Sequence, residues 1–152
     1  NYGNRIDSIN YALSCDDGLN IKNYDRADII LTGVSRSGKT PTCLFLALQY
    51  GIFAANYPLI EEDLKTIKLP TILQKNKNKL FGLSINPVRL QNIRDERRSN
   101  SGYASIDQCR KEVKLAEDMF VQNQVPFLDT SHTSIEEIAG RILNKSSIKR
   151  RY

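Results

Sequence analysis

Long hydrophobic segments are missing from this sequence. No apolar run approaches the roughly 18 residues of a membrane-spanning helix, so we expect no transmembrane segment and no membrane partner. The opening NYGNRIDSIN is polar, unlike the apolar core of a signal peptide. Internal repeats and low-complexity tracts are absent as well. The 152 residues, 40% hydrophobic and 26% charged, therefore predict one globular domain with its own core.

Cysteine and histidine are scarce. Cys15, Cys43 and Cys109 are an odd number without C-x-x-C spacing, a pattern typical of reduced thiols in a cytoplasmic protein. His132 is the only histidine, and no carboxylate or cysteine stands at ligand spacing from it. We therefore interpret His132 as a loop residue rather than a metal ligand or catalytic group.

The excess of positive charge needs a separate explanation. A net charge of +5 and a pI of about 9.2 would suit a nucleic-acid binder. A nucleotide site also needs Lys and Arg, however, and the basic tail KSSIKRR at residues 145–151 is typical of a solvated chain end. We expect no nucleic-acid partner; salt-sensitive oligonucleotide binding that depends on this tail would favour the other interpretation.

One segment completes the spacing G-x-x-x-x-G-K-[ST]. Its residues, all expected to bind nucleotide, are Gly33, Val34, Ser35, Arg36, Ser37, Gly38, Lys39 and Thr40. In such a loop the backbone N–H groups surround phosphates, Lys39 reaches the terminal phosphates and Thr40 is a ligand of Mg²⁺. Lys39 is thus the first catalytic candidate, because its cation can stabilise a moving phosphoryl group. Arg36 either contacts a phosphate or points into solvent.

The flanks of this loop support the motif. An apolar run at 28–32 predicts a buried strand, and helical spacing of apolar residues predicts a helix over 40–50, ended by Gly51. Further strands are expected near 53–57, 79–85 and 125–128. Helices are expected over 5–13, 61–66, 105–122 and 133–143, and from Asn86-Pro87 to about residue 100. The predicted fold class is α/β, a P-loop nucleotide-kinase-like parallel sheet with helices on both faces.

The acidic residue that usually accompanies such a phosphate loop at the metal ion is harder to find. No apolar strand after the loop ends in a clear acidic residue, and Asp129 at the end of the fourth strand is more typical of a turn cap. Asp16 and Asp17 precede Gly18 and could supply a metal ligand and a general base. An ordinary Asp-Gly turn is the alternative.

Three arginines share one predicted helix face. Arg94, Arg97 and Arg98 have the spacing i, i+3 and i+4, which suits a phosphorylated partner or a phosphoryl group in transfer. A solvated face paired with Asp95 and Glu96 explains the same spacing equally well.

Several longer segments resemble a known family. GVSRSGKTPT, ALQYGIFAANYPL, KLFGLSINPVRLQNIRDERRSNSGYAS and QCRKEV are similar to the phosphoenolpyruvate synthase regulatory proteins and to their relatives, the pyruvate, phosphate dikinase regulatory proteins. The resemblance runs from about residue 5 to 143. It implies a serine/threonine kinase that uses ADP to phosphorylate and inactivate its target enzyme. It also implies a phosphorylase that removes the group with inorganic phosphate and releases pyrophosphate.

The resemblance also assigns roles to residues of this chain. It implies that Gly33 to Thr40 bind ADP with Mg²⁺, and the Asp16-Asp17-Gly18 element matches a family motif, with Cys15 where relatives often have His. Family members carry an additional N-terminal domain, so residues 1–152 are expected to be the C-terminal part of a longer protein. Arg36 with the Arg94 cluster could hold the inorganic phosphate. The expected partner is phosphoenolpyruvate synthase or pyruvate, phosphate dikinase, and a homodimer stays open.

Two other functions compete with this one. A small-molecule kinase would prefer ATP and need no protein acceptor. A non-catalytic nucleotide-binding fragment would bind ADP without transferring phosphate.

Overall fold

The computed structural model describes residues 2–66, 68–97 and 102–145, which form an α/β fold around a four-stranded sheet. The strands are β1 (Ile29–Gly33), β2 (Ala54–Pro58), β3 (Leu80–Ser84) and β4 (Phe127–Asp129). They lie in the order β2-β1-β3-β4, and all three pairings are parallel. This arrangement confirms the predicted parallel sheet.

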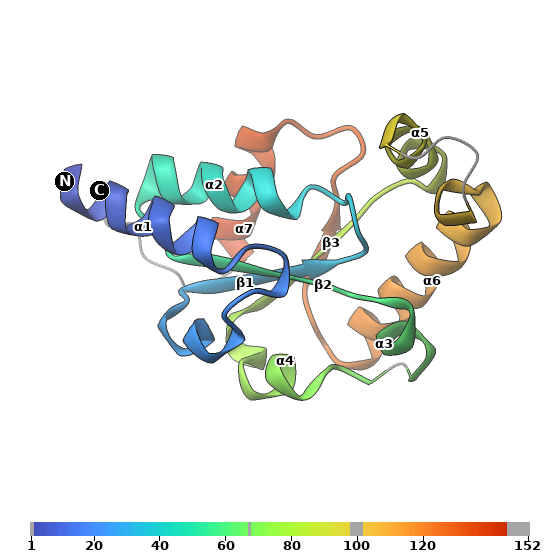
Figure 1. The fold of residues 1–152 in the computed structure, drawn as a ribbon, viewed down its shortest axis with the longest axis horizontal. Helices are drawn as coiled ribbons and strands as arrows, with labels where there is room; N and C mark the ends of the chain where they lie inside the picture. Colours follow the sequence, from blue (N-terminus) through green and yellow to red (C-terminus); the bar gives the residue numbers. More distant parts are fainter. Residues whose placement is uncertain (1, 67, 98–101, 146–152) are drawn as a thin grey trace.

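Helices cover both faces of the sheet, as predicted (Figure 1). On one face lie α1 (Tyr2–Ser14), α2 (Lys39–Tyr50) and α7 (Ile135–Lys145), and on the other α3 (Glu61–Thr66), α4 (Thr71–Lys75) and α6 (Ile106–Gln122). The helix α5 (Pro87–Arg97) packs against α6. No helix in the described part of the chain combines the length and apolar character needed to cross a membrane.

The apolar strands explain why the core has two halves. All five residues of β1 are buried, and successive side chains of a strand point to opposite faces. Ile29 and Leu31 therefore join the cluster under α2 and α7, whereas Ile30 joins the cluster under α4 and α6. A parallel strand buried on both sides needs this continuous apolar run.

Most element ends follow the residues that predicted them. Gly51 ends α2 in the left-handed conformation, and Asn86 Oδ1 accepts a hydrogen bond from Val88 N at 2.9 Å at the start of α5. Ser134 Oγ accepts from Glu137 N at 3.2 Å, which is one half of a capping box at the start of α7.

Several element ends shift by one to three residues, and the start of β4 and one short helix need a physical explanation. β4 begins at Phe127 rather than Val125, because Val125 N still donates to Phe120 O at 2.9 Å as α6 ends and Pro126 has no N–H to give the ladder. The short helix α4 was not predicted; it begins after Pro70, which serves as its N-cap.

Candidate active site

The phosphate loop connects the end of β1 to the start of α2. Gly33 ends the strand, where an added Cβ would lie 2.4 Å from the Leu83 carbonyl oxygen, so a larger residue would have to displace backbone. Arg36 and Gly38 have φ of 72° and 97°, which turn the chain back on itself before α2 begins. The turn places the N-terminus of α2 at the loop, where a helix can bind an anion.

Hydrogen-bond donors occupy five backbone carbonyl groups of this loop. They are Leu59 N on Gly33 (2.9 Å), Lys39 Nζ on Val34 (2.7 Å), Arg94 Nη2 on Ser35 (3.1 Å), Thr130 Oγ1 on Ser37 (3.2 Å) and Thr42 Oγ1 on Gly38 (2.7 Å). With its carbonyls bound, the loop can present N–H groups to an anion. The buried Ser37 Oγ has no hydrogen-bond partner among the described residues, so a phosphate oxygen would satisfy it.

Lys39 lies against the loop and not in solvent. Its residue is only 4% exposed, and Nζ donates to Val34 O at 2.7 Å. Burial lowers the pKa of Lys39 to about 8, while the nearby Asp17 carboxylate acts in the opposite direction. A bound phosphate would favour the charged form in the same way as Asp17 does.

Asp16 and Thr40, far apart in sequence, meet beside the loop. Thr40 Oγ1 donates to Asp16 Oδ1 at 2.7 Å, and Asn56 Nδ2 donates to the same carboxylate oxygen at 2.6 Å. A hydroxyl and a carboxylate are the oxygen ligands that Mg²⁺ prefers, and Mg²⁺ commonly takes its remaining ligands from phosphates and water. The pair therefore fits a magnesium ion bound together with a nucleotide. Across the described ranges, no three His, Cys, Asp or Glu side chains gather to form an all-protein metal site.

Asp17 has a different environment from Asp16. Its backbone is left-handed (φ 55°), its N–H donates to Asn56 Oδ1 at 2.9 Å, and its side chain is exposed. A left-handed aspartate costs free energy that neighbouring contacts must offset. The Asp-Gly turn considered as the alternative is present. Within it, the Asp16 carboxylate contacts Thr40, whereas the Asp17 side chain is exposed.

Asn56 is a site residue that the sequence analysis missed. It is fully buried in the middle of β2, and its amide joins the Asp16 carboxylate to the Asp17 N–H. Its backbone N donates to Cys15 O at 3.3 Å, and its backbone O accepts from Tyr24 Oη at 2.9 Å. An amide in the otherwise apolar run FAAN was the signal, since a buried polar side chain needs partners.

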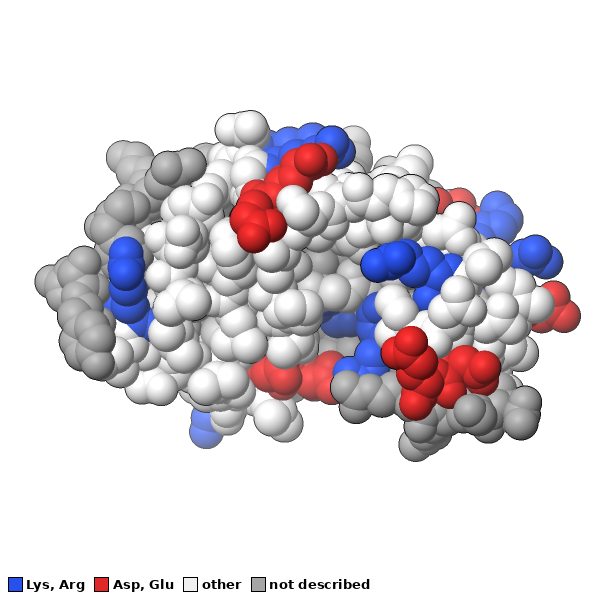
Figure 2. Space-filling view, turned by 90° about the horizontal axis from the view of Figure 1, so that it is seen from above, with Lys and Arg blue, Asp and Glu red and all other residues white. Residues whose placement is uncertain are grey.

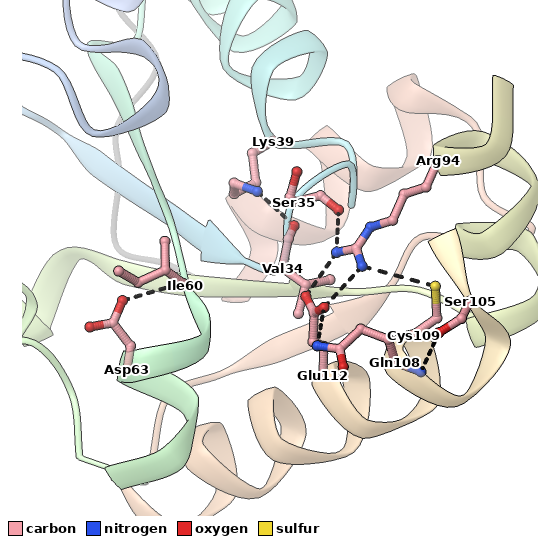
Figure 3. A network of polar contacts seen from close by, with 10 residues as sticks. All are labelled: Val34, Ser35, Lys39, Ile60, Asp63, Arg94, Ser105, Gln108, Cys109 and Glu112. Atoms are coloured by element: carbon pink, nitrogen blue, oxygen red, sulfur yellow. Dashed lines mark hydrogen bonds and ion pairs between the residues drawn. The ribbon is translucent and has the colours of Figure 1, made fainter. Parts of the chain in front are cut away.

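The placement of Arg94 on a solvated or phosphate-binding face is wrong. Arg94 is 0% exposed, and its guanidinium binds both carboxylate oxygens of Glu112, at 2.9 and 3.1 Å (Figure 3). Nη2 also donates to Ser35 O, so Arg94 supports the loop from behind instead of facing a ligand. The Arg97 side chain and the whole of Arg98 lie outside the described residues, and their phosphate-binding role stays a prediction.

Two other arginines do face open space beside the loop. A cavity of about 280 Å³, here called the Arg36 cavity, lies between the loop, α5 and the segment entering α7. It is lined by Arg36, Ser37, Gly38, Pro41, Thr42, Ile85, Arg89, Ile93, Thr130, Thr133, Ile135 and Ile138. Its apolar walls and its two cations suit the base and the charged end of a nucleotide. Figure 2 shows Lys and Arg side chains around a hollow on one face, with Asp and Glu side chains nearby.

The remaining candidates have ordinary structural roles. Asp129 Oδ1 accepts from Ser131 N at 2.7 Å, which confirms a turn cap at the end of β4. His132 is exposed in the loop before α7, as predicted. At the end of β3, Ser84 Oγ donates to Glu117 Oε2, a contact between distant elements that the sequence analysis did not anticipate.

The comparisons with known proteins show which family the chain belongs to. A family described as kinase/pyrophosphorylase matches residues 1–143. The chain belongs to the kinase/pyrophosphorylase family. This membership confirms the resemblance on which the expected ADP chemistry rests.

Curated relatives of this family are closely similar in sequence. A protein of Pseudoalteromonas translucida is 59% identical over 150 residues, which are 99% of this chain and 56% of that protein. Proteins of Neisseria gonorrhoeae and Shewanella loihica are 56% and 54% identical, over 99% and 98% of this chain and 55% of each protein. All three are provisionally named phosphoenolpyruvate synthase regulatory proteins. The chain spans about half the length of these relatives.

Proposed function

We propose that this chain supplies the nucleotide site of a bifunctional regulator of phosphoenolpyruvate synthase. In one direction it would transfer a phosphoryl group from ADP to a threonine of that enzyme and inactivate it. In the other, inorganic phosphate would remove the group and release pyrophosphate. Membership in the kinase/pyrophosphorylase family and the names of the relatives support this assignment.

The hydrogen bond between Thr40 and Asp16 carries the proposal. It joins the last residue of the phosphate loop to a carboxylate 24 positions earlier, so the loop is more than a Gly/Ser turn between a strand and a helix. When bound, Mg²⁺ would neutralise charge on the phosphate oxygens, with Thr40 and Asp16 as its protein ligands. Lys39 and the N-terminus of α2 would hold the phosphates themselves.

The kinase reaction needs a base for the acceptor hydroxyl. The threonine oxygen forms a bond to the β-phosphorus of ADP while the bond from that phosphorus to the oxygen bridging to the α-phosphate breaks, and AMP leaves. Asp17 takes the hydroxyl proton, because its carboxylate is exposed and lies within electrostatic range of Lys39. Lys39 stabilises the charge on the group in transfer.

The reverse reaction uses the same groups. An oxygen of inorganic phosphate forms a bond to the phosphorus of phosphothreonine, and the bond from that phosphorus to the threonine oxygen breaks. Asp17 takes a proton from the incoming phosphate and passes it to the threonine oxygen, and pyrophosphate leaves. Because Arg94 is committed to Glu112 and Ser35, Arg36 and Arg89 replace it as candidates to hold the incoming phosphate.

A transfer assay tests this function. ADP labelled at the β-phosphate, or ATP labelled at the γ-phosphate, is incubated with phosphoenolpyruvate synthase and the chain, and label on the acceptor is measured. We expect transfer from ADP with Mg²⁺, at least 100-fold slower in Lys39→Ala and unchanged in Lys75→Ala, an exposed lysine on α4. Turnover of ATP without a protein acceptor would favour a small-molecule kinase. ADP binding with no transfer would favour a non-catalytic module.

A further inference from the structure

A second cavity lies beside the phosphate loop, between Ser35, the β2–α3 connection and α6. Its volume is about 500 Å³, and we call it the Ser35 cavity. The described residues that line it are Ser35, Pro58, Leu59, Ile60, Glu61, Gly102, Gln108 and Glu112. None of these residues lines the Arg36 cavity, so the loop contributes successive residues to two separate spaces.

The two cavities differ in charge. The described lining of the Arg36 cavity includes two arginines and no carboxylate, whereas that of the Ser35 cavity includes Glu61 and Glu112 and no Lys or Arg. Arg94 neutralises Glu112, whereas Glu61 forms only an exposed pair with Lys65 at 3.8 Å, which contributes little. Glu61 is therefore the carboxylate that would repel the strongly anionic phosphates of a nucleotide. The Ser35 cavity therefore suits a neutral or cationic occupant, and its floor of Pro58, Leu59 and Ile60 suits an apolar one.

The candidate base lies on this side of the loop. A Cβ added to Gly18 would lie 3.4 Å from Pro58 Cδ, so the Asp16–Gly18 turn packs against a wall of the cavity. The next wall residue, Leu59, donates its N–H to Gly33 O at 2.9 Å. A hydroxyl that enters the Ser35 cavity thus approaches the loop from the side where Asp17 stands.

The cavity also shares residues with the network that holds the loop (Figure 3). Glu112 lines it, and the same carboxylate binds Arg94, whose Nη2 donates to Ser35 O. Gln108, another lining residue, donates to Glu112 Oε2 at 2.8 Å. An occupant would contact the groups that fix the phosphate loop, which is the position of a second reactant.

We propose that the Ser35 cavity binds the hydroxyl-bearing segment of the protein that accepts the phosphoryl group. The segment places an apolar side chain against Pro58, Leu59 and Ile60 and a basic side chain beside Glu61. Its hydroxyl proton goes to Asp17 as the oxygen bonds to the phosphorus of the nucleotide, and the nucleoside monophosphate leaves through the Arg36 cavity. This inference rests on the proposed transfer to a protein hydroxyl.

A charge-reversal pair tests the acidic wall. Glu61 lines the cavity, and Glu62, the next residue of the same first turn of α3, does not line it. Glu61→Lys and Glu62→Lys make the same charge change in the same turn of the helix. Glu61→Lys also removes the exposed pair with Lys65, a contact of the kind that contributes little. We expect Glu61→Lys to raise KM for phosphoenolpyruvate synthase at least tenfold and to leave ADP affinity, measured by calorimetry, within twofold. Glu62→Lys should change neither quantity by more than twofold.

Photocrosslinking tests the location without any need for catalysis. Benzoylphenylalanine replaces Ile60 in one variant and Leu48 on α2 in another; both residues are 52% exposed. We expect crosslinks to phosphoenolpyruvate synthase from position 60 and none above background from position 48. Equal crosslinking from the two positions, or an unchanged KM in Glu61→Lys, would overturn the assignment of the cavity. Crosslinking from position 60 in the variant, together with a wild-type chain that transfers no label, would retain the docking site and refute the proposed reaction.

Discussion

Removing the Asn56 amide should weaken the part of ADP affinity that depends on Mg²⁺ and leave the metal-free affinity nearly unchanged. This side chain is the only described group that binds both halves of the Asp16–Asp17 pair, through hydrogen bonds of 2.6 and 2.9 Å. Asn56→Ala would leave the Asp16 carboxylate with Thr40 as its remaining side-chain hydrogen-bond partner among the described residues. The carboxylate would then be free to rotate away from the loop.

The size of the effect follows from the two lost bonds. A buried hydrogen bond to a charged group contributes about 1.5–3 kcal/mol, and one between neutral groups about 0.5–1.5 kcal/mol. We therefore expect Asn56→Ala to lower the free energy of unfolding by roughly 2–4 kcal/mol, measured by urea denaturation. For a domain of this size the melting temperature would fall by roughly 4–16 °C.

The binding assay distinguishes positioning from simple destabilisation. ADP affinity is measured by calorimetry with and without Mg²⁺, below the melting temperature. We expect the gain in affinity from Mg²⁺ to fall at least tenfold in Asn56→Ala, with metal-free affinity changed less than threefold. Asn76→Ala is the control, because Asn76 is also buried and donates to Ile72 O at 2.9 Å, far from the loop in sequence. Asn56→Ala with a full Mg²⁺ effect and a stability loss below about 0.5 kcal/mol would refute the reasoning.

Three further predictions concern charge and packing. Burial lowers the pKa of Lys39 from 10.5 to about 8, so folding disfavours its protonated form. The free energy of unfolding should therefore rise between pH 8 and 10.5, by an amount on the order of 3 kcal/mol. Urea titrations across this pH range should show the rise in the wild type and not in Lys39→Met. Glu112→Gln should cost about 3–5 kcal/mol, because it leaves a buried arginine charge unpaired, whereas Glu137→Gln in an exposed pair should cost less than about 1 kcal/mol. Gly82→Ala should destabilise by about 1–3 kcal/mol, since its Cβ would lie 2.7 Å from an aromatic ring of α6, and Gly140→Ala on α7 should be neutral or stabilising. Equal melting temperatures within either matched pair would contradict the corresponding argument.

The features that the sequence predicted correctly depend on residues that are close together in the chain. The phosphate loop, its strand and its helix follow from the local pattern of glycine, β-branched and apolar residues within 28–51. The helix start at Asn86 and the helix end at Gly51 are equally local and were also predicted. Asp16 was named as a candidate, but its contact with Thr40 spans 24 residues and depends on how α1 and β2 pack together.

Arg94 shows why the remaining parts were not predictable. Helical spacing correctly groups side chains on one face of α5 but does not reveal which element packs against that face. Here α6 packs against α5 and brings Glu112 to the arginine, so a residue expected at a ligand is buried in an ion pair. Asn56 escaped prediction for a related reason: the sequence shows a polar residue in a strand but not the two aspartates that it meets.

The buried position of Arg94 changes its role and does not diminish it. A guanidinium facing a ligand would contribute to affinity alone, whereas here it connects the Ser35 carbonyl to Glu112 on the wall of the Ser35 cavity. An occupant of the Ser35 cavity that displaces Glu112 would act on the phosphate loop through Arg94, which contacts both. By reciprocity, any factor by which the proposed acceptor alters the affinity for nucleotide equals the factor by which nucleotide alters the affinity for that acceptor. Arg94→Lys, which keeps the charge but loses the two-pronged contact, should reduce that factor more than it reduces either affinity alone.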